Sequence, residues 1–149
     1  MKKTILLFLT TTIILMSCKN NDCDKLCFTS PEPFQFELVD ATTGENLFTN
    51  KTYESRYIKV INIEDENRVD FNFISENNYN ILVLQDLGWQ TEIVNYSIQI
   101  NDKELFTLYV DAERNSEDCC SFTRYNEIKI ENSNYTFDKG KGLYTILIE

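Results

Sequence analysis

The sequence predicts an all-β protein, with a single antiparallel β-sandwich that follows a cleaved signal peptide. Short segments of alternating apolar and polar residues recur between residues 34 and 149, and this two-residue period is typical of half-buried strands. Residues that favour turns separate these segments roughly every 8–12 residues, which is the spacing of sandwiches and barrels. No stretch of helical length repeats its apolar residues with the period of an α-helix. The many asparagines and aspartates, which form turns readily, favour a sandwich over a barrel.

The first residues have the three zones of a secretory signal. Lys2 and Lys3 give a positive start, residues 5–16 form a mostly apolar run, and the small residue Ser17 precedes Cys18. The apolar run is shorter than the about 20 residues that a permanent transmembrane helix needs. Residues 1–17 are therefore expected to be a cleaved signal peptide.

The residues around Cys18 add a lipid anchor to this expectation. Leu15-Met16-Ser17-Cys18 resembles a bacterial lipobox, in which the chain is cut before the cysteine and the thiol receives a diacylglycerol. Two or more acyl chains hold a protein stably on a membrane. The resemblance implies a lipoprotein that is bound to its membrane through the lipid on Cys18.

Four further cysteines, Cys23, Cys27, Cys119 and Cys120, are expected to form disulfides, because an even number in an exported chain is typical of them. Pairing Cys23 with Cys27 would force Cys119 to bond its own neighbour, although adjacent side chains of an extended chain point to opposite faces. The two arrangements that join the N-terminal segment to the region near residue 120 both remain open. A zinc site is the alternative use of the four cysteines, but adjacent cysteines depart from the usual ligand spacing. No metal or other cofactor is therefore expected.

The charge balance argues against a nucleic-acid partner, and the composition argues against an enzyme. The formal net charge is −10, and loss of the signal peptide removes two lysines, so the surface repels nucleic acid. The sequence contains no histidine, which excludes Ser–His and Cys–His catalytic pairs. A carboxylate-dependent hydrolase is the enzyme class that the composition leaves open, because paired acids can act as acid and base.

The exported chain divides into a tether and a domain. Residues 18–33 form a polar, cysteine-bearing tether that ends at two prolines, and residues 34–149 form the sandwich. Alternating residues predict strands at 34–38, 58–60, 69–73, 94–100, 106–110, 128–130, 135–137 and 144–148. A continuous apolar run predicts a strand that is buried on both faces at 81–84. Turns are expected at 40–44, 64–67, 101–103 and 140–142, and a charged loop at 111–118.

Several segments carry a likeness to known proteins. The early cysteines, Pro-Phe-Gln-Phe-Glu-Leu-Val-Asp at 33–40, Thr-Gly-Glu-Asn-Leu-Phe at 43–48 and Asp-Cys-Cys at 118–120 resemble small lipoproteins of Bacteroidota, flavobacterial ones especially. This resemblance implies a lipoprotein of the cell envelope, and it implies no activity. Residues 38–45 are also similar to the first strand and turn of carboxypeptidase-regulatory-like, transthyretin-type sandwiches. The expected sandwich is therefore immunoglobulin-like or transthyretin-like.

Aromatic residues are the candidate binding residues. Trp89 is the only tryptophan in the sequence, and an exposed tryptophan can stack on a sugar ring or anchor a protein interface. Tyr53 and Tyr57 add aromatic surface. The sequence thus predicts a non-enzymatic binding module for a protein or a glycan. The alternative is a structural or accessory subunit of an outer-membrane assembly.

One acidic loop is a candidate metal site. Glu64-Asp65-Glu66 offers the carboxylate oxygens that Ca²⁺ prefers. The loop lacks the spacing of a known calcium-binding loop, so a solvated loop is the expected use of these residues.

The residue after Cys18 indicates in which membrane the lipoprotein resides. Lys19 stands where an aspartate would signal retention in the inner membrane of enteric bacteria, so an outer-membrane lipoprotein is expected. Whether the domain faces the periplasm or the cell surface stays open at this point.

Overall fold

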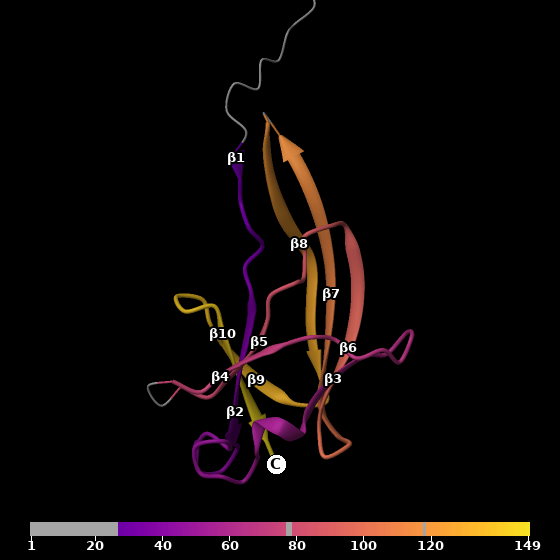
Figure 1. Ribbon diagram of the computed structural model, residues 1–149. Coiled ribbons are helices and arrows are strands. Elements are labelled where there is room, and N and C mark those ends of the chain that lie inside the picture. Colours follow the sequence, from indigo (N-terminus) through magenta and orange to yellow (C-terminus); the bar gives the residue numbers. More distant parts are fainter. Residues whose placement is uncertain (1–26, 77–78, 118) are drawn as a thin grey trace, which may run out of the picture.

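The computed structural model describes residues 27–76, 79–117 and 119–149, which form ten β-strands and one short 3-10 helix (Figure 1). The expected signal peptide, the expected lipidation site Cys18, Cys23 and most of the tether therefore lie outside the described residues. Within the described ranges, no helix is long and apolar enough to span a bilayer.

The strands form two five-stranded sheets. The first sheet has the order β1 (Cys27–Phe28), β8 (Cys120–Glu131), β7 (Lys103–Glu117), β6 (Glu92–Ile100) and β3 (Ile58–Asn62). The second sheet has the order β4 (Asn72–Ile74), β5 (Ile81–Leu84), β2 (Phe34–Asp40), β10 (Leu143–Ile148) and β9 (Asn134–Asp138). The 3-10 helix η1 (Ser55–Tyr57) leads directly into β3.

The alternating residues of both sheets meet in one apolar core. The rings of Phe36 in β2 and Phe106 in β7 are both fully buried, and their centroids lie 5.2 Å apart. Each such buried side chain contributes about 1.5–3 kcal/mol to the stability of the fold. The same core also contains Leu38, Val94, Ile98, Leu108, Val110 and Ile146. This arrangement confirms the predicted sandwich.

Two predicted turns form for the expected reasons. Oδ1 of Asp40 accepts the backbone N–H groups of Thr42 at 2.9 Å and Thr43 at 2.7 Å, which closes the turn after β2. Asn101 and Asp102 both have positive φ, at 50° and 64°, as a tight hairpin between β6 and β7 requires.

The sheets are mixed, which corrects the prediction of a purely antiparallel sandwich. β2 pairs in parallel with β10, and β1 pairs in parallel with β8. The two-residue period shows which face of a strand is buried, but it does not show which strand lies beside it or in which direction that strand runs. The first long strand of the domain lies between β5 and the last strand, and this placement produces the parallel pair.

The charged loop predicted at residues 111–118 is wrong, because β7 continues to Glu117 and β8 begins at Cys120. The two strands pair as far as Glu117 and Cys120, so backbone hydrogen bonds, rather than an apolar face, hold this part of the hairpin. Figure 1 shows that the end of the hairpin projects beyond the second sheet, toward β1. We call the described residues between 113 and 125 the hairpin arm.

Candidate binding surface

Trp89, the tryptophan predicted as a binding residue, lies in the loop between β5 and β6 and is 46% exposed. Phe28 of β1 stacks on it, with the ring centroids 5.4 Å apart and the ring planes 26° apart. Phe28 is itself 60% exposed. Two large aromatic rings that stack and still face solvent form an apolar surface that folding leaves uncovered.

Arg114 of β7 completes this surface. The centre of its guanidinium group lies 5.0 Å from the centroid of the Phe28 ring, which is a cation–π contact. Its Nη1 donates to the carbonyl oxygen of Thr29 at 2.9 Å and to Oγ1 of Thr123 at 2.8 Å. Its Nη2 is buried and has no hydrogen-bond partner in the part of the chain that the structure describes. We call Phe28, Trp89 and Arg114 the aromatic platform.

Hydrogen bonds hold the loop that carries Trp89. The N–H of Gly88 donates to Oε1 of Glu92 at 2.7 Å, and the carbonyl oxygen of Gly88 accepts from Oγ1 of Thr123 at 2.6 Å. Nε1 of Trp89 donates to the carbonyl oxygen of Gln85 at 3.2 Å. The indole ring is therefore held in place before any partner arrives, which lowers the entropy cost of binding.

Gly88 is required by its backbone and by its surroundings. Its φ is +86°, in the left-handed region that side chains with a Cβ disfavour. A Cβ at this position would lie 2.8 Å from Cγ2 of Thr123 and 3.0 Å from the hydroxyl oxygen of Tyr125. The loop thus packs directly against the hairpin arm.

Tyr125 joins the arm to two other segments. Its hydroxyl lies 3.3 Å from the carbonyl oxygens of both Glu32 and Leu87, and it can donate its proton to either. Burial, together with the negative charges of Glu32 and Glu92, raises the pKa of Tyr125 to about 12. The hydroxyl therefore stays protonated and remains a donor at neutral pH.

A disulfide fixes Phe28 to the arm. Cys27 is bonded to Cys120, with the two Cα atoms 4.4 Å apart, and β1 pairs with β8 at this point. Of the two cross-linked arrangements that the sequence left open, the structure has the one that contains Cys27–Cys120. Cys119 is also disulfide-bonded, and Cys23 lies outside the described residues.

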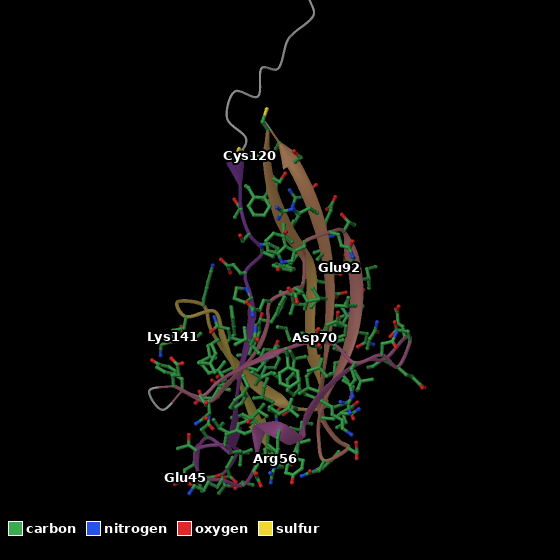
Figure 2. All side chains as sticks on the ribbon, viewed as in Figure 1. Glu45, Arg56, Asp70, Glu92, Cys120 and Lys141 are labelled. Atoms are coloured by element: carbon green, nitrogen blue, oxygen red, sulfur yellow. A yellow bond between two sulfur atoms is a disulfide. The ribbon has the colours of Figure 1, made fainter. Side chains whose placement is uncertain are left out.

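The predicted binding residues Tyr53 and Tyr57 do not join Trp89. Tyr57 lies in η1, is 40% exposed, and has the guanidinium of Arg56 at 4.7 Å from its ring centroid. Figure 2 shows Arg56 at the end of the molecule opposite to Cys120. Tyr53, two residues before η1, packs against Phe48 with 6.1 Å between the ring centroids. The structure therefore separates the candidate residues into two groups at opposite ends.

The acidic loop at Glu64-Asp65-Glu66 forms a turn that bonds to itself. Oδ1 of Asp65 accepts the backbone N–H of Asn67 at 3.1 Å, and its Oδ2 accepts the side-chain amide of Asn67 at 2.9 Å. Glu66 has a positive φ of 59°. Across the described ranges, no three acidic, cysteine or histidine side chains are arranged to hold a metal ion. The structure does not bring the three calcium candidates together around one point.

A polar cleft of about 550 Å³ lies between the β6–β7 hairpin and the C-terminus. Several of its polar groups bond to one another or to nearby protein groups. Glu104 accepts from the hydroxyl of the buried Ser97 at 2.6 Å and from the amide of Asn132 at 2.8 Å. The hydroxyl of Ser133 donates to the carbonyl oxygen of Leu147 at 2.7 Å. These bonds commit Glu104, Asn132 and Ser133 to the fold, so this cleft is the weaker candidate.

Phe28 and Arg114 were not predicted as binding residues. Arg114 falls in the segment that the sequence predicted as a charged loop, where the pattern does not show a strand. Phe28 follows Cys27 directly, and this position next to a cysteine is the one sequence feature that could have predicted a role for Phe28. The disulfide ties Cys27 to the first residue of β8, at the end of the hairpin arm, so the adjacent ring lies beside the arm rather than in the core.

Comparison of the chain with known proteins gives no matching family model, no matching curated protein and no matching solved structure.

Proposed function

We propose that the chain is an envelope lipoprotein whose β-sandwich is a non-enzymatic binding module, and that the aromatic platform is its contact surface for another protein. The observation that carries this proposal is the exposed stack of Phe28 on Trp89 beside Arg114. Tryptophan and arginine supply a large share of the binding energy in protein interfaces. A platform that is already held in place needs little reorganisation when a partner binds.

The guanidinium group of Arg114 favours a protein over a glycan at this surface. It places a positive charge beside the exposed ring of Phe28, and arginine and aromatic residues are both enriched at protein interfaces. A protein partner that covers the rings and brings a carboxylate to the guanidinium would use both properties of the platform.

The position of the platform indicates where the partner lies. Eight residues lie between the expected lipidation site Cys18 and Cys27, and the nine residue-to-residue steps of an extended chain span at most about 30 Å. The platform begins at Phe28, so it stays close to the membrane surface. We infer that the partner is embedded in, or anchored to, the same membrane, which is expected to be the outer membrane.

The absence of histidine from the sequence supports a module that binds rather than one that catalyses. A structural subunit of an outer-membrane assembly is the second candidate function. The two differ in one respect, because a purely structural subunit would not depend on Trp89 or Phe28 for its contact with the assembly.

Photo-cross-linking in intact cells tests the proposal. A photoreactive phenylalanine analogue replaces Trp89 in the lipidated chain, and the same analogue replaces Ile74 of β4 as a control, because Ile74 is similarly exposed at 42%. We expect a discrete cross-linked protein from position 89 that position 74 does not give. Phe28→Ala in the first variant should reduce its yield.

Equal cross-linking from both positions would contradict the proposal. So would a cross-link from position 89 that Phe28→Ala leaves unchanged, since the stacked platform would then have no part in the contact.

A further inference from the structure

A second cleft, of about 450 Å³, lies at the end of the molecule opposite to the platform. It is formed by the loop after β2, by β4 and by the residues just before β5. Figure 1 shows these segments away from β1 and the hairpin arm. Tyr53, one of the predicted binding residues, lines this cleft.

Three aromatic rings form one wall of this cleft. Phe48 and Phe73 meet edge to face, with centroids 4.8 Å apart and an interplanar angle of 62°. Tyr53 meets Phe48 at the same angle, with centroids 6.1 Å apart. All three rings pack partly against the core and are only half-buried. The three residues therefore line the cleft with aromatic surface that their packing holds in place.

Polar groups of several kinds lie beside the aromatic wall. Asn80 donates one N–H to Oγ1 of Thr49 at 2.8 Å, and this bond uses one of the four hydrogen bonds that a side-chain amide can form. Ser55 and Ser75 line the cleft with hydroxyl groups. Lys51 and Glu54 also line the cleft. The positive charge of one offsets the negative charge of the other.

Asn46 holds the cleft in shape. Its Oδ1 accepts the backbone N–H groups of Phe48 at 3.0 Å and Thr49 at 3.1 Å. Its Nδ2 donates to Oε1 of Glu37 at 3.2 Å and to the carbonyl oxygen of Asn80 at 3.1 Å. One amide thus ties the loop after β2 to β2 itself and to the start of β5. The walls are built by the fold, so binding does not have to order them.

We propose that this cleft binds a neutral saccharide. A sugar ring has an apolar face of C–H groups, which packs on aromatic rings, and a rim of hydroxyls, which both donate and accept hydrogen bonds. An apolar ligand would strip water from the amide, the hydroxyls and the two charges without replacing their hydrogen bonds. An acidic saccharide would be repelled by a chain whose formal net charge is −10.

This site does not depend on the proposed function, since it uses different residues at the other end of the domain. The cleft lies away from β1, where the chain leads toward its expected anchor, so a membrane-bound domain would present it outward. The two proposals can therefore fail separately.

Isothermal titration calorimetry of the full exported chain, with its disulfides intact and in a sugar-free detergent, tests the proposal. The probes are tetrasaccharides built from glucose, mannose, galactose or N-acetylglucosamine, with a glucuronate-containing tetrasaccharide as the acidic comparison. We expect at least one neutral probe to bind with a Kd of about 1 mM or tighter. Tyr53→Ala should weaken this binding about tenfold, as loss of an aromatic contact does.

Two variants serve as controls. Tyr57→Ala removes an exposed tyrosine close in the sequence but outside the cleft, and Trp89→Ala alters only the platform; both should bind like the unaltered chain. Trp89 is the only tryptophan, so its fluorescence should not change when a saccharide fills the distant cleft. If Tyr53→Ala proves unfolded, Asn80→Ala replaces it and should weaken binding several-fold.

The proposal is overturned if no neutral probe binds, or if the acidic probe binds more tightly. It is also overturned if Trp89→Ala abolishes binding while Tyr53→Ala preserves it, because the saccharide would then occupy the platform.

Discussion

Replacing Gly88 with alanine should damage the platform, and the structure allows the size of the effect to be worked out. Two costs add at this position. The left-handed backbone at φ +86° costs a residue with a Cβ about 1–2 kcal/mol. The new Cβ would also lie 2.8 Å from Cγ2 of Thr123, and such overpacking costs about 1–3 kcal/mol. Gly88→Ala should therefore lower the free energy of unfolding by about 2–5 kcal/mol.

Gly44 offers a matched control. Its φ is +72°, and a Cβ there would meet no heavy atom within 4 Å. Gly44→Ala should therefore bear the backbone cost alone, about 1–2 kcal/mol. The difference between the two variants isolates the contact of the Trp89 loop with the hairpin arm.

Urea unfolding followed by circular dichroism measures both losses, and the fluorescence of Trp89 reports the loop. Gly88→Ala should shift the emission, because the loop must move away from Thr123 and Tyr125, and it should lower the yield of cross-linking from position 89. Gly44→Ala should leave the emission unchanged. Equal losses in the two variants, or an unshifted emission in Gly88→Ala, would refute the packing described for this loop.

Three further predictions concern the same fold. The double variant Cys27→Ser/Cys120→Ser opens a link across 93 residues of sequence. The free energy of unfolding in urea should fall by less than the about 4–5 kcal/mol that an isolated link of this length contributes, because Cys119 stays disulfide-bonded. Trp89 fluorescence should change as Phe28 detaches, and an unchanged emission would show that the disulfide does not hold the stack. The pKa of Tyr125 is about 12 in the folded state, against an ordinary value of 10.0, so the unfolded state loses this proton first and the free energy of unfolding should fall as pH rises from 10 to about 12. Urea unfolding measured across this pH range should show a smaller fall in Tyr125→Phe, and an identical fall would count against the burial of this hydroxyl. Asn46→Ala removes the hydrogen bonds that shape the second cleft, so the free energy of unfolding in urea should fall by about 1–3 kcal/mol and saccharide binding should weaken. Full binding by a destabilised variant would show that the cleft does not need this amide.

The sequence predicts the sandwich because burial determines which positions along a strand are apolar. Phe36 and Leu38 alternate with polar residues and lie in the core, and residues 81–84 form an unbroken apolar run and are buried on both faces. Asn101 and Asp102 mark the hairpin through their tolerance of positive φ. Each of these features depends on residues that are close together in the chain.

The features that the sequence does not predict depend on residues that are far apart. Alternation along β2 cannot show that β10 runs parallel to it. The hairpin arm carries no continuous apolar stripe and meets the main core at its base, through Tyr125, so its strands resemble a charged loop in the sequence. The stack of Phe28 on Trp89 needs the Cys27–Cys120 disulfide and the loop after β5 at once. The aromatic wall of the second cleft likewise combines Phe48 with Phe73 from a separate strand.

The proposed lipid on Cys18 would hold this binding module at a membrane, and metabolic labelling tests for it directly. Cells that express the chain can be grown with an alkyne-bearing fatty acid, and the protein is then purified, coupled to a fluorophore and compared with a Cys18→Ala variant. We expect the unaltered chain to carry the label and to sediment with the outer membrane, and the variant to lose both properties. An unlabelled chain that stays soluble, or a Cys18→Ala variant that keeps the label, would contradict lipidation at Cys18.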